Sequence, residues 1–365
     1  MAWRIEKRST PAASLPWWIF PASFGLAIVV GGAIFAALGV NPLTAYNTML
    51  NGAFGSFFLF SEVVVRAIPL MLTGLAVALA ATMLLWNIGC EGQLVWGGIC
   101  AAGTGLYLAP HLPPLLVLPA VIIAGAAGGA LWGLIPGVLK AYLAVNEILS
   151  SLLLNYVAII FMEHLYFGPW RNPEGFGFPG TAQIAEAARI PHYFGTRIHL
   201  GLVLAFVLAG LLYAALRATP WGYRVRAIGL NQRAARYAGF RIKRQVVGVM
   251  VLSGALAGLA GMGEVSGIHF RLQQGLAVGY GYDGIIVAWL ARLNPLAAPL
   301  ASLLLGALIV GGEQLQSILH LPASISMVLE AVMLFGLLLG ETLARFRLVR
   351  RPAAVQDDML SGETP

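Results

Sequence analysis

Hydrophobic runs long enough to cross a lipid bilayer recur along almost the whole sequence, from Trp17 to Leu343. The hydrocarbon core of a bilayer is about 30 Å thick and is crossed by about 20 apolar residues in a helix. By this measure the sequence predicts an all-α polytopic membrane protein with about ten transmembrane helices. The predicted helices lie at residues 17–40, 63–86, 93–109, 114–139, 145–167, 198–216, 245–264, 275–293, 296–314 and 323–343.

Composition excludes a soluble globular fold. Apolar residues make up 59% of the 365 residues and charged residues only 10%, a balance typical of proteins surrounded by lipid. The basic opening MAWRIEKR precedes an apolar run that is too long for a cleaved signal peptide and that further hydrophobic segments follow. We therefore expect a retained first helix. Cys90 and Cys100 lack CxxC spacing, and we interpret them as small buried hydrophobic residues.

Lys and Arg predict the orientation, because short cytoplasmic loops retain them. They gather at both ends of the chain and in residues 217–244, which hold eight of the 22 basic residues and no acid. The terminal cations are Arg4, Lys7, Arg8, Arg345, Arg347, Arg350 and Arg351. Even numbers of crossings separate these clusters, so we expect a cytoplasmic segment 1–16, a transmembrane domain 17–344 and a cytoplasmic tail 345–365. Residues 168–197 would then form an extracytoplasmic loop, either a docking surface or an ordered connector.

Two acidic motifs repeat inside the predicted membrane segments. The stretches GCEGQLV (89–95) and GYDGIIV (281–287) share the pattern G-x-acid-G-x-x-V. By the predicted topology, the first opens an outward-going helix and the second an inward-going one. An inverted repeat relating helices two to five to helices seven to ten has this form, and a chance match of glycine-rich sequence is the alternative. Glu91 and Asp283 would cap a helix or face a polar cavity.

A polar stripe opens the predicted helix 145–167. In NEILSSLLLNY, Glu147, Ser151 and Asn155 are four residues apart and share one face of the helix. The stripe either lines a translocation path or forms hydrogen bonds with neighbouring helices. Asn146 and Glu147 are also a suitable helix start, which is a purely structural explanation for both residues.

Tryptophan side chains raise the possibility of a stacking site for a planar solute. The sequence has nine of them, and most are expected in the aromatic belts at the membrane surfaces. Trp86, Trp96 and Trp132 lie further inside the predicted helices and are the candidates for contact with a solute.

Signatures of enzymes are missing from the sequence. It contains no HExxH, no GxSxG and no GxxxxGK[ST], which argues against a metalloprotease, a serine hydrolase and a nucleotide-binding protein. The six histidines include no pair at metal-binding spacing. We therefore expect no catalytic residues, no metal and no cofactor in this chain, and nothing in the sequence points to nucleic acid as a partner.

The basic loop 217–244 has a pattern that topology alone does not explain. Its segment GLNQRAARYAGF carries small residues spaced to form a short helix with a smooth face, which suits a groove on another protein. Contact of the arginines with anionic lipid is the other possibility.

This segment resembles the cytoplasmic coupling segment of ATP-binding cassette importer permeases of the sugar and nucleoside branch, which is similar to the branched-chain amino acid permeases. The stretches NIGCEGQLVWGG, VNEILSSLLLNYVA, PEGFGFPGT and GYGYDGIIVAWLARLNP resemble matching stretches of bacterial nucleoside permeases, in the same order along nearly the whole chain. The resemblance implies a ten-helix permease in the inner membrane, with helices two to five and seven to ten pseudo-symmetric and both termini cytoplasmic. It also implies cytoplasmic ATPase subunits that bind the ATP, a second related permease subunit forming a heterodimer, and an extracytoplasmic solute-binding lipoprotein.

The resemblance further implies roles for particular residues. The contact with the ATPase would be formed by Gly229, Asn231, Ala234, Ala235, Tyr237, Ala238 and Gly239. The polar membrane positions would be Asn87, Gly89, Glu91, Gly92, Gln93, Asn146, Glu147, Asn155 and Asp283, to which the polar stripe adds Ser151. Leu230 and Gln232 stand where relatives often carry more polar or acidic residues, so we expect the fit to the ATPase to differ in detail.

Three functions stay open at this point. The first is an ATP-driven importer permease for nucleosides or related small solutes. The second is the same machine for a monosaccharide or another small polar solute. The third is an ion-coupled secondary transporter, which membrane acids and an inverted repeat would also permit.

Overall fold

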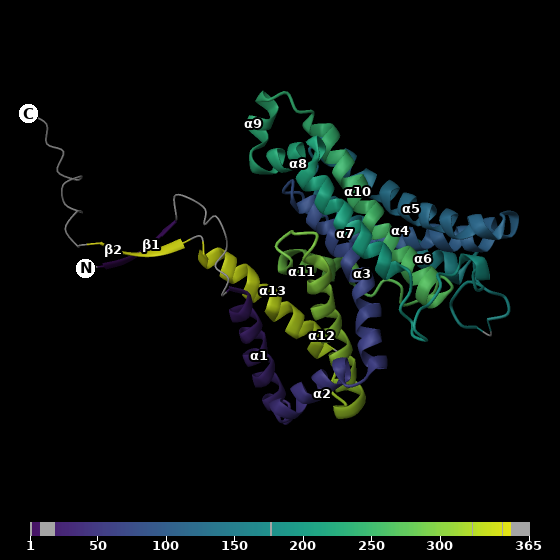
Figure 1. Ribbon diagram of the computed structural model, residues 1–365, viewed down its shortest axis with the longest axis horizontal. Coiled ribbons are helices and arrows are strands. Elements are labelled where there is room, and N and C mark those ends of the chain that lie inside the picture. The colour runs from purple at the N-terminus through teal and green to yellow at the C-terminus, as the bar shows by residue number, and fades with distance from the viewer. Residues whose placement is uncertain (1, 8–18, 176, 323, 345, 352–365) are drawn as a thin grey trace, which may run out of the picture. The chain divides into compact units, whose positions relative to one another are not determined.

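The computed structural model describes residues 2–7, 19–175, 177–322, 324–344 and 346–351 (Figure 1). The helices are α1 (Ile19–Ala37), α2 (Pro42–Phe54), α3 (Phe57–Ala81), α4 (Cys90–Gly103), α5 (Pro114–Leu143), α6 (Glu147–Phe167), α7 (Gly201–Ala218), α8 (Pro220–Leu230), α9 (Gln232–Tyr237), α10 (Ile242–Gly263), α11 (Tyr280–Leu290), α12 (Ala298–Leu319) and α13 (Ser324–Ala344). Two π-helical segments, η1 (Thr104–Leu108) and η4 (Glu264–His269), extend α4 and α10, and two 3₁₀ turns are η2 (Ala109–His111) and η3 (Glu186–Ala188).

The chain divides into two compact units. The smaller unit comprises Met1–Leu43 and Met327–Pro365, and the larger comprises Thr44–Ser326. Arg8 and Arg345, two of the terminal cations named from the sequence, lie outside the described residues. The domain boundaries expected from the sequence stay predictions.

The smaller unit departs from the all-α prediction in one place. Strand β1 (Ala2–Lys7) pairs antiparallel with β2 (Phe346–Arg351), with Ala2 opposite Arg351 and Lys7 opposite Phe346. The segment AWRIEK alternates apolar and charged residues, and such a period of two favours a strand. The remaining regular elements among the described residues are helical.

Each of the ten predicted ranges overlaps a helix, but the helices differ in length. Six of them are long and apolar enough to cross a membrane, or up to seven if α1 and α2 form one broken span. Helix α11 has 11 residues, so it is about 16 Å long, shorter than the hydrocarbon core. Helix α4 has 14 residues and continues directly into the five residues of η1, and this segment is not among the six candidate spans. The number of ten spans and the pseudo-symmetry therefore stay predictions.

Helix α3 is the centre of the larger unit. Of its apolar window, 94% is buried inside the protein, because α7, α10, α11 and α12 pack around it. It begins earlier than the predicted range, since the hydroxyl of Ser56 caps its first turn by accepting a hydrogen bond from the Leu59 N–H at 3.2 Å.

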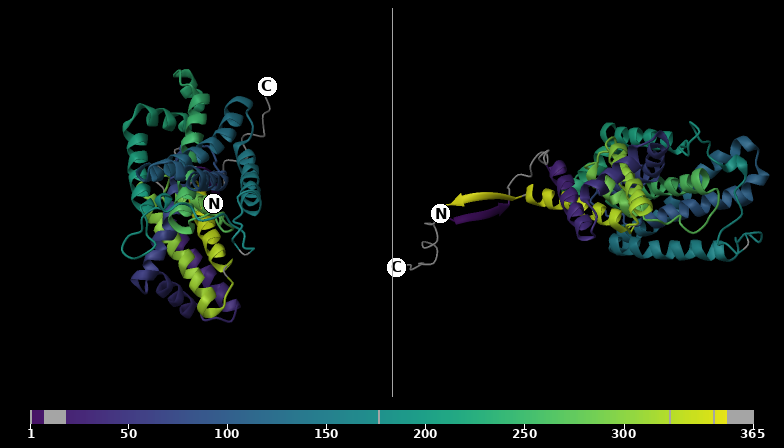
Figure 2. Two further views of the ribbon diagram at one scale, coloured as in Figure 1. Left: turned by 90° about the vertical axis from the view of Figure 1, so that its right-hand side faces the viewer. Right: turned by 90° about the horizontal axis from the view of Figure 1, so that it is seen from below.

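Helix α10 packs against α5, α4 and α3 (Figures 1 and 2). Glycines make this packing close. A Cβ atom on Gly254 would overlap the carbonyl of Gly129, and one on Gly97 would overlap the backbone of Gly258. Small residues bring helix backbones into direct contact, which is how helices associate when lipid removes the hydrophobic driving force. This packing holds the middle of α4 against the second half of α10.

Candidate functional site

The two glycine and acid motifs meet inside the larger unit. Glu91, in the first turn of α4, accepts hydrogen bonds from the backbone N–H groups of Gly279 at 2.9 Å and Gly281 at 2.6 Å, at the start of α11. A Cβ atom on Gly281 would overlap the backbone of Glu91, so glycine is required for this approach. Helix N-termini carry partial positive charge, and the buried Glu91 carboxylate therefore stabilises both helix ends at once. We call this contact the α4–α11 junction.

A closed set of amide and hydroxyl groups lies beside the α4–α11 junction. Asn87 and Gln93 exchange two hydrogen bonds between their side-chain amides, at 2.8 and 3.0 Å. Asn87 also donates to the Ser253 hydroxyl at 2.8 Å, which donates to the Ala76 carbonyl at 2.6 Å. Ser253 lies near the middle of the 28-residue apolar segment Ile242–His269. The polar groups thus gather at mid-depth of a candidate membrane span.

Asn155 connects α6 to both short helices. Its amide oxygen accepts a hydrogen bond from the Gly92 N–H at 2.9 Å, and its NH₂ group donates to the Ile88 carbonyl at 2.9 Å and to the Tyr282 hydroxyl at 3.1 Å. Four hydrogen-bonding sites are available to an asparagine side chain, and three are used here. Asn155 therefore holds the start of α4 and the start of α11 in one arrangement.

Asp283, the second acid of the repeated motif, has a different environment. It is half-buried in the first turn of α11. Within the described part of the chain, its carboxylate has no hydrogen-bond donor and no ion pair. Of the two matching acids, Glu91 accepts one hydrogen bond on each carboxylate oxygen, whereas Asp283 accepts none from the described residues.

The polar stripe of α6 is buried along one face, and its members have separate partners. Glu147 forms an ion pair with Lys140 of α5 at 2.6 Å. The Ser151 hydroxyl donates to the Ile148 carbonyl of its own helix at 3.3 Å. Asn146 is exposed and caps α6 by accepting a hydrogen bond from the Ile148 N–H at 2.9 Å, which is the structural explanation considered for it.

Aromatic rings stack next to the junction. Trp96 of α4 stacks on Trp132 of α5, with ring centroids 4.7 Å apart, and on Phe161 of α6, with centroids 5.1 Å apart. The indole N–H groups of both tryptophans are buried and have no hydrogen-bond partner among the described residues. An unsatisfied buried donor costs about 1–3 kcal/mol, so these groups are two donors that an acceptor would satisfy. Trp86 instead stacks on Trp289 at 4.8 Å and is partly exposed.

Sequence reasoning missed three residues of this region. Ser253 lies in a run of small residues that gave no polar signal, and its role depends on which helix passes beside it. Tyr282 is adjacent to Asp283 in GYGYD, so the motif contained it without indicating its hydrogen bond to Asn155. Phe161 has the exposure of a lipid-facing residue, and only its stacking on Trp96 distinguishes it.

The predicted coupling segment forms two short helices, α8 and α9. Asn231 caps α9 by accepting a hydrogen bond from the Ala234 N–H at 3.0 Å. Gly239 adopts φ +79°, which favours glycine because a side chain would strain this left-handed backbone. Ala234, Tyr237 and Ala238 are exposed, whereas Ala235 is buried. Most of the predicted contact residues therefore lie on the exposed segment 230–239 around α9, which we call the α9 tip.

Gly229 and Leu230 differ sharply in their surroundings. A Cβ atom on Gly229 would overlap the Thr82 carbonyl at the end of α3, so this residue is part of an internal contact. Leu230 is 88% exposed, and Tyr237 is 96% exposed on the same tip. Exposed large apolar side chains mark interaction surfaces when they occur together, which makes Leu230, named from the sequence only as a difference from relatives, a contact candidate in its own right.

The connection between α6 and α7 is tied to the rest of the larger unit. Its backbone forms an isolated bridge between Gly180 and Gln273, and a second bridge, between His192 and His199, lies within the connection itself. Phe178 and Phe194 are 76% and 81% exposed. The described part of this loop therefore contacts the segment that follows η4 and carries two exposed aromatic side chains.

We expect Asn155→Leu to destabilise the protein by about 3 kcal/mol, because it leaves the Gly92 N–H and the Ile88 carbonyl buried without partners. The measurement is the thermal unfolding midpoint of the purified protein in detergent. Leu153→Ala, at an exposed position of the same helix, is the control and should leave the midpoint nearly unchanged. An equal midpoint for both variants would contradict the role assigned to Asn155.

The fold and the site together define a class of protein. Long apolar helices surround short helices that meet at a buried polar junction, and a basic segment with exposed apolar residues extends from the bundle. Among the described residues no three His, Cys, Asp or Glu side chains come together as a metal site. This is the architecture of a multi-pass membrane transport protein.

Comparison with known proteins identifies the family. The model of the family described as branched-chain amino acid transport system / permease component matches residues 59–338, and the chain belongs to this family of membrane permeases. It is 34% identical to the glucose ABC transporter permease protein TsgB13 of Haloferax volcanii, over 94% of each chain. It is 32% identical to the guanosine ABC transporter permease protein NupP of Bacillus subtilis, over 85% of this chain and 90% of the relative. It is 29% identical to the nucleoside ABC transporter permease protein NupB of Lactococcus lactis, over 84% and 86%.

Proposed function

We propose that this chain is the membrane subunit of an ATP-binding cassette importer that moves nucleosides or related small solutes across the cytoplasmic membrane. The observation that carries the proposal is the similarity, along most of both chains, to permeases named for guanosine and nucleosides. Two further relatives, with 25% and 28% identity, carry the same substrate names. ATP hydrolysis would occur on a partner subunit and not on this chain.

A monosaccharide is the second candidate solute. The glucose permease relative is 34% identical and covers slightly more of the chain than the guanosine permease relative at 32%. Overall identity therefore does not separate the two solutes. The third function considered, an ion-coupled secondary transporter, loses its support because the chain belongs to a family of transport-system permease components.

The groups proposed to meet the solute are those that the protein leaves unsatisfied. Glu91, Asn87 and Asn155 are occupied by hydrogen bonds within the chain and act in holding the α4–α11 junction. The indole N–H groups of Trp96 and Trp132 are buried donors without partners among the described residues, and they suit the ring nitrogens and carbonyl groups of a nucleobase. The half-buried Asp283 carboxylate suits the hydroxyl groups of a ribose or a hexose.

The proposed coupling runs from the exposed tip of α9 to the polar junction. An ATPase groove would hold Leu230 and Tyr237, and α8 would transmit the movement. Gly229 of α8 packs against Thr82, which begins the turn leading to Asn87. ATP binding would then switch the bundle between inward-facing and outward-facing states through this connection.

Further partners and the orientation are part of the proposal. The exposed Phe178 and Phe194 of the α6–α7 connection suit an extracytoplasmic solute-binding lipoprotein. A second, related permease subunit would complete the pore as a heterodimer. The pairing of β1 with β2 brings segments from both ends of the chain together, which supports placing both termini on one side of the membrane, and their basic residues favour the cytoplasmic side. The inverted repeat also stays part of the proposal, and it rests on the pattern that the two motifs share in the sequence.

The test is uptake of labelled guanosine and labelled glucose by cells with and without this gene, under ATP depletion and, separately, with an uncoupler. We expect the gene to confer guanosine uptake that ATP depletion abolishes and that an uncoupler leaves largely intact while cellular ATP is maintained. Glucose uptake alone would establish the second candidate. Uptake that follows the proton gradient would overturn the ATP-driven mechanism.

A further inference from the structure

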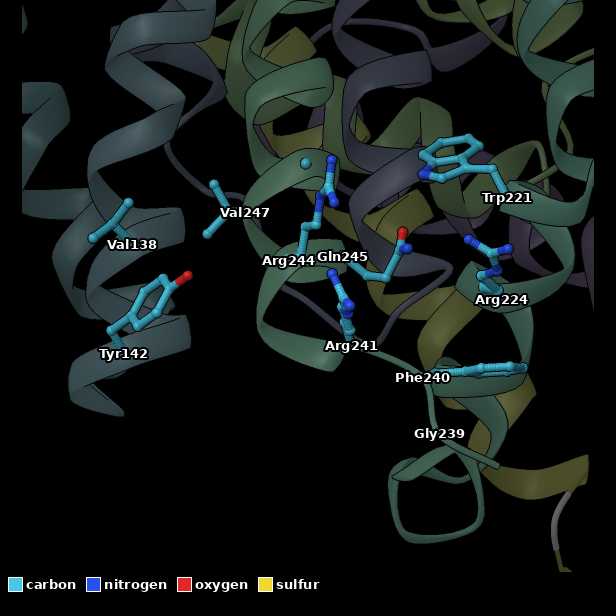
Figure 3. A pocket seen from close by; sticks show the side chains of 11 residues that line it. Val138, Tyr142, Trp221, Arg224, Gly239, Phe240, Arg241, Arg244, Gln245 and Val247 are labelled. Carbon is cyan, nitrogen blue, oxygen red and sulfur yellow. The ribbon is translucent and has the colours of Figure 1, made fainter. Parts of the chain in front are cut away.

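A basic cavity lies between α5, α8 and the start of α10, with a volume of about 850 Å³. Arg224 of α8, Arg241 and Arg244 line it, together with Gln245 of α10. Figure 3 shows Arg224 on one side of Gln245, and Arg241 and Arg244 on the other side, toward Tyr142 of α5. Three guanidinium groups from α8 and the start of α10 thus surround one opening, and among the described residues no acidic side chain lines it.

The three arginines have free donors. Within the described residues, none of the three guanidinium groups forms a hydrogen bond or an ion pair with the protein. Guanidinium groups bind phosphate through paired N–H donors and remain charged at any physiological pH. Basic residues are expected at a cytoplasmic membrane surface for reasons of topology, but topology does not gather three of them around one cavity without partners.

The cavity lies at the end of two candidate membrane spans. Tyr142 is in the last turn of α5, and Arg244 and Gln245 are in the first turns of α10. Both helices are long and apolar enough to cross a bilayer. The rings of Tyr142 and Trp221 beside the arginines are the residue types that favour the headgroup region.

An exposed apolar stripe on α5 leads away from the cavity into the apolar part of the helix. Leu131, Ile135, Val138 and Tyr142 follow at helical spacing and are 64%, 38%, 37% and 59% exposed. Val138 and Tyr142 also line the cavity. A ligand bound by the arginines would therefore have a continuous apolar surface for a hydrocarbon chain.

We propose that this cavity binds the phosphate-bearing headgroup of an anionic phospholipid from the cytoplasmic leaflet, with an acyl chain along the α5 stripe. The arginines supply the charge and the paired donors, and the stripe distinguishes a lipid from a free phosphate ion. The exposed tip of α9 with Leu230 and Tyr237 stays available to a protein partner. The inference does not depend on the identity of the transported solute.

The test is native mass spectrometry of the purified full chain, released from detergent in the presence of dioleoylphosphatidylglycerol or dioleoylphosphatidylcholine. We expect selective retention of phosphatidylglycerol and about tenfold weaker retention by Arg241→Gln/Arg244→Gln, since each basic residue adds to the attraction for anionic lipid. Arg224→Gln, on the other side of the cavity, should weaken retention as well. The matched control is Arg233→Gln/Arg236→Gln on α9, which removes the same charge outside the cavity and should retain the lipid as the unaltered protein does.

Several outcomes would overturn the proposal. If the cavity variants and the α9 control lost lipid retention to the same extent, the net charge of the protein alone would account for lipid binding. Equal retention of both lipids would remove the role of the headgroup charge. Full displacement of phosphatidylglycerol by millimolar inorganic phosphate would indicate a site for the free ion, and unchanged lipid retention combined with lost ATPase-subunit binding in the cavity variants would indicate a protein-binding site. Circular dichroism and gel filtration of each variant verify that the chain is folded.

Discussion

Gly281→Val should abolish transport and lower the stability of the protein. The first side-chain atom at this position would overlap the backbone of Glu91, and a backbone cannot move aside as a flexible side chain can. Separating α4 from α11 would also break the hydrogen bonds from Gly279 and Gly281 to the Glu91 carboxylate. We expect a destabilisation of about 3 kcal/mol, seen as a lower unfolding midpoint, with uptake of the transported solute reduced to background.

The control for this prediction is Gly210→Val in α7. A Cβ atom at Gly210 would have no atom within 4 Å, so the variant carries the same chemical change without the overlap. It should keep its unfolding midpoint and its uptake close to those of the unaltered protein. If Gly281→Val matched Gly210→Val in both measurements, the close approach of α4 and α11 would not exist in the working protein.

The double variant Leu230→Ser/Tyr237→Ala should lose ATP-dependent uptake while the protein remains folded. Both side chains are almost fully exposed, and surface substitutions away from special features change stability by about 0.5 kcal/mol or less. Their loss would remove the apolar anchors proposed to enter the ATPase, and such anchors carry most of the binding energy of an interface. Binding of the purified ATPase subunit to the permease is the direct measurement.

Phe194→Ala is the matched control for the coupling prediction. Phe194 is also a large exposed apolar residue, but it lies in the α6–α7 connection, which is predicted to be on the opposite side of the membrane. This variant should bind the ATPase subunit normally. Normal ATPase binding and uptake by the double variant, at normal membrane levels, would place the coupling contact elsewhere.

Helix positions were largely predictable because lipid imposes a simple requirement. Backbone groups must find partners within the membrane, and apolar side chains must face lipid, so long apolar stretches in the sequence correspond to helices such as α5 and α12. The predicted range 93–109 agrees closely with α4 and its extension η1. Helix α11 is shorter than its predicted range 275–293, because it begins only at Tyr280, where two backbone N–H groups meet the Glu91 carboxylate.

The two acids of the repeated motif show that the sequence pattern also could not predict the role of a single residue. Glu91 and Asp283 occupy matching positions in the sequence, and the pattern gave them the same interpretation. In the structure, two backbone N–H groups approach Glu91 from another helix, and no described donor reaches Asp283. A side chain's hydrogen-bond partners come from segments distant in the sequence, so the motif indicates a polar position without deciding its role.

The sequence by itself determined that this protein lies in a membrane, where its basic segments concentrate and which polar residues are exceptional, because hydrophobicity and charge are properties of the residues themselves. The tertiary structure alone decided that the repeated motifs touch, that Asn155 joins three helices, and that three arginines surround one cavity. These features depend on distances between residues on different helices, and such distances are set by how the helices pack.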